Sequence, residues 1–389
     1  MQEFSHWASM SEPFAHVSGP RDAKVLAIGE AFGEAELASG LPFAGTSGKE
    51  LFFMLGEAWP DIWPEGHANI KHTALRDMAN HTNYWLSMRE EWLSRASVLF
   101  TNVLNLHPPG NKLETFCTDK AHVGPNYALP AISRAAYLRP EYLPEVERLF
   151  AEIREVRPNL VLALGNTACW ALLRLTNIGS IRGACTWSQE CAVKVLPTYH
   201  PAGVLRQWSW RTVVIADFMK ARREAEFPEI RRPERQVICD PTLEDIRFWS
   251  VAAIHAPMLS IDIETSRGQI TCIGFARTEA NAIVIPFMRR DLSSYWPDHK
   301  SEVEAWKLVR DLLLCPVAKL FQNGLYDIQY LWKMGFRIRN AQHDTMLLHH
   351  SLYPELQKGL GFLGSIYSHE SAWKLMNRKS KQDQTKREE

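Results

Sequence analysis

The sequence predicts two α/β domains of different kinds, and three observations lead to this prediction. Short apolar runs alternate with segments of helical spacing over the first 225 residues, which is typical of a parallel sheet with helices on both faces. A mostly charged stretch with two prolines follows at 220–236 and offers nothing that could line a core. Beyond Met258, three β-rich runs lie close enough together to form an antiparallel meander.

The composition limits the class of protein. The 389 residues suffice for two or three domains with buried cores. The 44 Lys and Arg residues balance the 44 Asp and Glu residues, so the chain lacks the net positive charge of a strongly basic nucleic-acid-binding protein. The seven cysteines have no C-x-x-C spacing, which favours a reducing compartment. With no apolar run of roughly 20 residues and no signal sequence, we expect a cytoplasmic protein without a membrane partner.

Four apolar runs are expected to be buried strands of the first domain, at 24–28, 98–101, 160–164 and 193–196. Helical spacing is found between and after them, at 48–58, 143–156, 167–175 and 211–225. In a parallel sheet, ligands bind beyond the carboxyl ends of the strands. The candidate site residues are therefore those that follow each strand, namely Gly29, Glu30, Asn102, Gly165, Asn166 and Tyr199 to Pro201.

Four motifs at these strand ends resemble those of the uracil-DNA glycosylase superfamily, closest to its family 4. The family pattern G-E-x-P-G-x-x-E followed by G-x-P-F-x-G corresponds to GEAFGEAE at 29–36 and GLPFAG at 40–45. The other three motifs are TNVLNLHPPGNK at 101–112, RPNLVLALGNTACWALL at 157–173 and LPTYHPAGVLR at 196–206. The resemblance covers residues 22–225 and implies a uracil-DNA glycosylase-like parallel-sheet sandwich that excises uracil from DNA.

The resemblance also assigns roles to individual residues. Such an enzyme flips the base out of the stack and stabilises the charge that appears on it as the glycosidic bond breaks. Phe43 would be the wall on which the base stacks, and Asn102 would bind the uracil edge beside Gly29. His200 would donate a hydrogen bond to the uracil oxygen, and Glu30 would hold the attacking water. From the residues alone, a core aromatic, a turn asparagine and a structural histidine stay open as alternatives.

Two departures from the family pattern have physical consequences. Phe32 stands where the pattern has proline, so a backbone constraint beside Glu30 is expected to be lost. Family 4 members usually carry four cysteines for an iron–sulfur cluster, whereas no cysteine precedes Cys117 here and Leu106 and His107 stand before Pro108. We therefore predict that the protein holds no iron–sulfur cluster.

The segment 59–95 is rich in histidine and tryptophan and is an insertion relative to the family pattern. The histidines have no metal-binding spacing, so we expect a helical excursion on the surface. A stacking surface for single-stranded DNA is the alternative. The residues concerned are Trp59, Trp63, His67, His72, His81, Trp85 and Trp92.

In the second domain, Asp262 and Glu264 are two apart on a strand and therefore share a face. Two such carboxylates repel each other unless a cation intervenes, and Mg²⁺ or Mn²⁺ is the type of ion that oxygen ligands bind. Asn323 and Asp327 follow a later strand with the spacing of one helical turn. The pattern therefore predicts a carboxylate site on this domain.

These residues resemble the 3′–5′ exonuclease domain of family A DNA polymerases, which implies a ribonuclease H-like α/β fold over residues 258–374. By this resemblance Asp262, Glu264 and Asp327 are metal ligands and catalytic residues, and Asn323 contributes to substrate binding. The fourth acid of the family, in Y-x-x-x-D, is missing, because Ser371 lies four residues after Tyr367. Asp344 lies outside the family's ligand set. We expect a C-terminally incomplete domain with a weak metal site.

Together the halves resemble the N-terminal part of a bacteriophage family A DNA polymerase, without any polymerase motif. We expect a glycosylase-like domain at 1–225, a linker region at 226–257, the exonuclease-like domain at 258–374 and a disordered tail at 375–389. The implied function is phage DNA replication or repair, in the host cytoplasm if phage-encoded. The alternative is a non-catalytic, DNA-binding accessory portion of a split polymerase, whose partner is a separately encoded polymerase chain.

The missing cysteines generate a first prediction. The protein as purified should contain no stoichiometric iron and no visible absorption band, because thiolate ligands are absent from the N-terminal motifs. Metal analysis together with an absorption spectrum checks this. A brown preparation with stoichiometric iron would contradict it.

Overall fold

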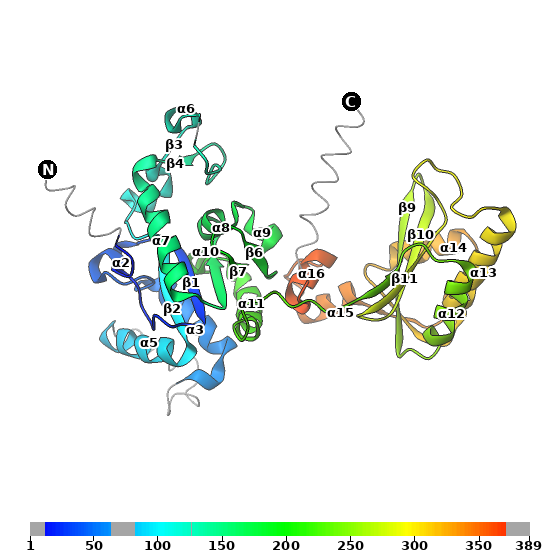
Figure 1. Cartoon of the computed structure of the whole chain (residues 1–389). Helices are drawn as coiled ribbons and strands as arrows, with labels where there is room; N and C mark the ends of the chain where they lie inside the picture. Colours follow the sequence, from blue (N-terminus) through cyan, green and yellow to red (C-terminus); the bar gives the residue numbers. More distant parts are fainter. Residues whose placement is uncertain (1–11, 64–81, 126, 371–389) are drawn as a thin grey trace. The chain divides into compact units, whose positions relative to one another are not determined.

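The computed structural model describes residues 12–63, 82–125 and 127–370. It divides into two compact units (Figure 1). The first contains the described residues up to Arg231 and those from Gly364 onward, and the second spans Arg232–Leu363. Both units combine helices with a central sheet, so the predicted α/β class is confirmed.

The first unit is built on a five-stranded sheet of order β2-β1-β5-β7-β6. The four predicted strands are confirmed and run parallel to one another, while β6 is antiparallel to β7. Because parallel strands end at the same edge, the residues that follow them meet there. The strand bounds are β1 Val25–Ala31, β2 Val98–Leu104, β5 Leu160–Leu164, β6 Thr186–Ser188 and β7 Val193–Thr198.

Helices cover both faces of this sheet, as the alternating pattern predicts. Helices α7 and α8 share a core with one face, and α5 and α11 pack against strands β2 and β7 respectively. The longer helices are α3 Thr46–Ala58, α5 Thr82–Ala96, α7 Leu143–Val156, α8 Asn166–Leu173 and α11 Trp210–Glu224. The shorter elements are α2 Glu34–Ser39, β3 Cys117–Thr118, α6 Lys120–Val123, β4 Tyr137–Leu138, α9 Ile178–Ile181 and α10 Pro201–Arg206.

The sequence explains where α7 lies and where it ends. Val146, Leu149 and Ile153 recur at helical spacing and are buried against the sheet. The helix stops at Val156 because Arg157 adopts a left-handed conformation (φ 49°) and Pro158 cannot continue it. The chain then enters β5 directly, which brings the next strand end to the shared edge.

The tryptophan-rich insertion differs from the prediction. Trp59, Trp63 and Trp92 are buried, and the Trp59 and Trp92 rings stack with centroids 6.1 Å apart. These three rings therefore form part of the core beside α3. They form neither the expected surface excursion nor a stacking surface for DNA. All three histidines of the insertion and the Trp85 side chain lie outside the described residues, the histidines being His67, His72 and His81.

The second unit contains a six-stranded mixed sheet of order β13-β12-β9-β10-β11-β8. Strands β9, β10 and β11 form the predicted antiparallel meander, and β12 and β13 continue the sheet in parallel beside β9. This order is that of the ribonuclease H-like fold predicted from the sequence. The bounds are β8 Gln236–Ile238, β9 Met258–Ser266, β10 Gln269–Thr278, β11 Asn281–Pro286, β12 Ala318–Phe321 and β13 Ala341–Asp344.

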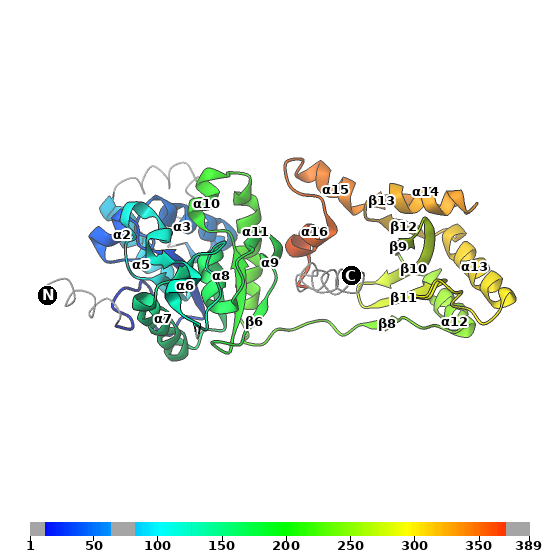
Figure 2. The ribbon, with the colours of Figure 1, turned by 90° about the horizontal axis from the view of Figure 1, so that it is seen from above.

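The segment 226–257, expected to be a linker, instead supplies two elements of the second unit. Strand β8 pairs in parallel with β11, and helix α12 (Leu243–Ala253) packs beside α13 (His299–Leu314), as Figure 2 shows. Ile246, Trp249 and Ala253 of α12 are buried in the core of this unit. Their burial is the physical reason that the segment folds.

The remaining helices of the chain are α14 Leu325–Lys333, α15 Thr345–Leu352 and α16 Leu360–Tyr367.

The C-terminal boundary also differs from the expected residue 374. The last turn of α16 belongs to the first unit, because Ser365 accepts hydrogen bonds from Arg182 Nη1 (2.7 Å) and Lys220 Nζ (2.6 Å). Residues 371–389, which include the expected tail, lie outside the described residues. Across the part of the chain that the structure describes, no helix is long and apolar enough to cross a membrane.

The burial of the insertion generates a second prediction. Trp92→Ala should destabilise the protein by roughly 3–5 kcal/mol, because it removes a fully buried ring and leaves a cavity. Trp208→Ala is the matched control, since the Trp208 side chain is 53% exposed. Urea denaturation measures both. Equal effects of the two substitutions would show that Trp92 is not in the core.

Candidate active site

One pocket lies at the carboxyl edge of the first sheet, with a volume of about 510 Å³. It brings together four of the residues predicted from the sequence, Glu30, Phe43, Asn102 and His200. Segments that follow β1, β2, β5 and β7 all contribute to its lining. The pocket thus has the location expected for a ligand site in a parallel sheet.

Gly29 makes room for the side chains of Asn102 and Phe43. It pairs with Asn102 in the β1–β2 register. A Cβ atom at Gly29 would lie 2.2 Å from Asn102 Oδ1 and 2.6 Å from Phe43 Cζ, so any other residue would displace both side chains. Asn102 is 2% exposed, and its Nδ2 has no hydrogen-bond partner among the described residues. This amide is therefore available for a ligand.

Phe43 is held as a rigid wall of the pocket. Its backbone is left-handed (φ 56°), an uncommon conformation that costs energy for an aromatic residue. The ring meets Phe100 edge-on at 5.1 Å and is stacked toward the His200 ring at 6.1 Å. Gly48 allows this close packing, because a Cβ atom there would lie 1.7 Å from the Phe43 carbonyl oxygen.

Two residues that the sequence analysis did not assign hold this wall in place. The Glu36 carboxylate accepts hydrogen bonds from Gly33 N (3.1 Å) and Gly45 N (3.0 Å), which ties the two halves of the first motif together. Arg89 donates to the Pro42 carbonyl oxygen from helix α5. Burial lowers the pKa of Arg89 to about 10. Glu36 is the last acid of the first motif, so its role could have been predicted from the sequence. No sequence pattern indicates a role for Arg89.

His200 is a neutral hydrogen-bond donor. It is the N-cap of α10, and its Nδ1 accepts a hydrogen bond from Ala202 N (3.2 Å). A neutral ring that accepts at Nδ1 carries its proton on Nε2. Burial, with a smaller contribution from the positive charge of Arg206, lowers the pKa of His200 to about 4. Near neutral pH the ring therefore presents an N–H group without a net charge.

Glu30 is oriented by the chain around it. Thr167, in the first turn of α8, donates a hydrogen bond to Glu30 Oε2. Phe32 lacks the ring constraint of proline, but its N–H donates to Leu106 O (3.1 Å), a bond that proline could not form. The Phe32 carbonyl also accepts from His107 Nδ1 at 3.0 Å. These two hydrogen bonds fix the backbone beside Glu30.

In the second unit, Asp262 and Glu264 share the exposed face of β9 while Ile261 and Ile263 point into the core, as predicted. Asp327 is buried, and its Oδ1 accepts a hydrogen bond from Ile263 N at 2.9 Å. Burial raises the pKa of Asp327 to about 6, and the negative charge of Asp262 adds to this effect. Partial burial and the charge of Glu264 likewise raise the pKa of Asp262.

Asn323 does not form the predicted helical pair with Asp327. It has a left-handed backbone (φ 59°) and precedes Gly324, the N-cap of α14, so it lies outside the helix. Its N–H donates to Asp344 Oδ1 (3.1 Å), while Asp344 Oδ2 accepts from Gly324 N (2.7 Å). Asp344 also caps α15. Asp344 is therefore occupied in holding the turn between β12 and α14.

The predicted metal ligands do not form a complete binding group. Carboxylate oxygens are suitable ligands for Mg²⁺ or Mn²⁺. Within residues 12–63, 82–125 and 127–370, however, no three His, Cys, Asp or Glu side chains are placed to hold one ion. The hydrogen bond from Ile263 N engages Oδ1 of Asp327 and holds this carboxylate beside β9. The weak metal site at Asp262, Glu264 and Asp327 stays a prediction.

The raised pKa of Asp327 generates a third prediction. A carboxyl group whose pKa rises from 3.8 to about 6 on folding stabilises the native state at low pH, and this contribution is lost as the pH rises from about 4 to 6. Asp327→Asn keeps an acceptor for Ile263 N and removes the titration. The variant should therefore gain stability relative to the wild type between pH 4 and pH 7, measured by thermal unfolding with and without Mg²⁺. A pH-independent difference would contradict the assignment.

Comparisons with solved structures give weak likenesses to exonucleases. The catalytic core of RRP6 from Trypanosoma brucei is 16% identical with a TM-score of 0.28, over 35% of this chain and 36% of that chain. Escherichia coli RNase D is 16% identical with a TM-score of 0.27, over 36% of this chain and 34% of its own. The chain thus spans about a third of these proteins. The strand order of the second unit, and not these alignments, identifies its fold.

Comparisons of sequence identify the first unit. A type-4 uracil-DNA glycosylase of Saccharolobus solfataricus is 26% identical over 211 residues, which cover 52% of this chain and 72% of the relative. The corresponding protein of Archaeoglobus fulgidus is 27% identical over 215 residues, or 52% of this chain and 77% of the relative. The profile of the uracil DNA glycosylase superfamily matches residues 16–224, more than half of the chain. The chain belongs to the uracil-DNA glycosylase superfamily.

Proposed function

We propose that the first unit excises uracil from DNA, with no metal ion or iron–sulfur cluster in the reaction. The observation that carries the proposal is the convergence of Glu30, Phe43, Asn102 and His200 on one pocket. Their spacing along the chain is large, and only the fold brings them together. The similarity to type-4 uracil-DNA glycosylases supports the same substrate.

Uracil recognition in this proposal depends on Phe43 and Asn102. A base flipped into the pocket stacks on the rigid Phe43 ring. The buried Asn102 amide offers both a donor and an acceptor to the Watson–Crick edge of the base. Because the Asn102 Nδ2 has no protein partner among the described residues, an empty pocket leaves this donor unsatisfied, and uracil binding satisfies it.

Bond cleavage depends on His200 and Glu30. As the glycosidic bond breaks, negative charge develops on the uracil oxygen, and the Nε2–H of neutral His200 donates to it. A donor that is fixed in place before the reaction stabilises such charge without reorganisation. Glu30, oriented by Thr167, holds the water that attacks the sugar carbon.

A fourth prediction tests this function. His200→Ala should lower the rate of uracil excision by roughly 10²- to 10³-fold, because the charge-stabilising donor is lost. His122→Ala is the control, since His122 is an exposed histidine outside the pocket. Release of uracil from labelled oligonucleotides, single-stranded and double-stranded, measures the rate. The wild-type rate should be the same with and without a chelator.

The outcome also decides between enzyme and binding module. Intact oligonucleotides that nevertheless bind tightly to the wild-type protein would contradict excision and support the accessory, DNA-binding alternative. In that alternative the chain is the accessory portion of a split family A DNA polymerase, and its partner is a separately encoded polymerase chain.

A further inference from the structure

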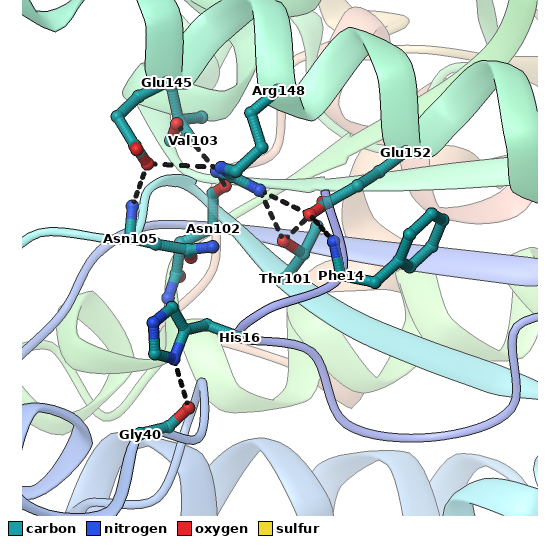
Figure 3. A network of polar contacts seen from close by, with 10 residues as sticks. All are labelled: Phe14, His16, Gly40, Thr101, Asn102, Val103, Asn105, Glu145, Arg148 and Glu152. Carbon is teal, nitrogen blue, oxygen red and sulfur yellow. Dashed lines mark hydrogen bonds and ion pairs between the residues drawn. The ribbon is translucent and has the colours of Figure 1, made fainter. Parts of the chain in front are cut away.

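A buried ion-pair network joins helix α7 to strand β2 (Figure 3). Arg148 occupies its centre between Glu145 and Glu152, and all three side chains come from one face of α7. Each of the three is at most 2% exposed. Burying three charges costs free energy unless each is fully hydrogen-bonded. We therefore asked which part of the structure these hydrogen bonds hold in place.

Every N–H group of the Arg148 guanidinium has an acceptor. Nε donates to Glu145 (3.2 Å), and Nη1 donates to Glu152 (2.7 Å) and Thr101 Oγ1 (3.3 Å). Nη2 donates to the backbone carbonyls of Asn102 (2.7 Å) and Val103 (3.2 Å). Five donors in a rigid plane fix the position of the strand end relative to α7 in a way that three lysine donors cannot.

The carboxylates of Glu145 and Glu152 also accept hydrogen bonds from β2 and from the residue that follows it. Glu145 Oε2 accepts from Asn105 N at 2.7 Å, and Glu152 Oε2 accepts from Thr101 Oγ1 at 2.8 Å. Thr101 and Asn102 are consecutive strand residues, so their side chains point to opposite faces. The network therefore holds the β2 end from the Thr101 side, while the Asn102 side chain is presented to the pocket.

We propose that Arg148 is a positioning residue for uracil recognition, which acts by fixing the backbone of Asn102. The inference rests on the proposed function, in which Asn102 binds the uracil edge. The Nδ2 atom of Asn102 has no hydrogen-bond partner within the described part of the chain. The direction in which the Asn102 side chain points therefore depends on the position of its backbone. Recognition groups must be held within a fraction of an ångström to discriminate between bases.

Arg148→Lys tests this role, because it keeps the buried positive charge and cannot reproduce the five donors. Lys194→Arg is the matched control. Lys194 is also a fully buried cation, but it lies at the start of β7 and donates to Glu224 and to carbonyls at 227 and 229. Both variants should lower the thermal midpoint. Only Arg148→Lys should weaken inhibition by free uracil, by about tenfold, with less discrimination between uracil and cytosine in DNA.

The result that overturns the inference is a folded Arg148→Lys protein with wild-type uracil affinity and wild-type discrimination. If Arg148→Lys does not fold, Glu145→Leu gives the same test, because it removes the acceptor of Asn105 N and of Arg148 Nε. Glu145→Gln retains a carbonyl acceptor and should restore the affinity. A wild-type protein that neither binds nor releases uracil would contradict the proposed function instead.

Discussion

The parallel register of β1, β2, β5 and β7 is the constraint on which the first unit depends. It places Gly29 opposite Asn102 and Leu164 opposite Thr198, so that the segments leaving these strands meet at one edge. Side chains alternate between the two faces of a strand, and a shift by one residue would turn Asn102 toward α7 and Thr101 toward the pocket. The pocket is thus a consequence of strand pairing, and its chemistry follows from which residues end the strands.

The groups around the pocket are costly to arrange, and the surrounding structure offsets those costs. Phe43 has a left-handed backbone, the half-buried His200 is held in its neutral form, and the Asn102 Nδ2 has no partner among the described residues. Two arginines buried behind the pocket, Arg89 and Arg148, hold the carbonyls of Pro42 and Asn102. Local strain that is supported by a rigid surrounding shell is typical of a binding or catalytic site.

Most of the sheet and the pocket could be predicted from the sequence, because apolar runs mark buried strands and the residues that end them are visible in the chain. The supporting contacts could not be predicted, since Arg89 and Arg148 act on residues 47 and 46 positions away. Strand β8 and helix α12 were missed because a charged stretch precedes them and only one side of α12 is buried. The i and i+4 spacing of Asn323 and Asp327 was misleading, because a left-handed residue interrupts the helix.

The central claim is that Phe43, Asn102 and His200 form one uracil-binding site. A crystal structure of the full chain with free uracil tests it most directly. The account predicts a base stacked on Phe43, with its Watson–Crick edge hydrogen-bonded to the Asn102 amide and an oxygen within hydrogen-bond distance of His200 Nε2. Uracil bound elsewhere, or bound in this pocket with Asn102 turned away from it, would contradict the account.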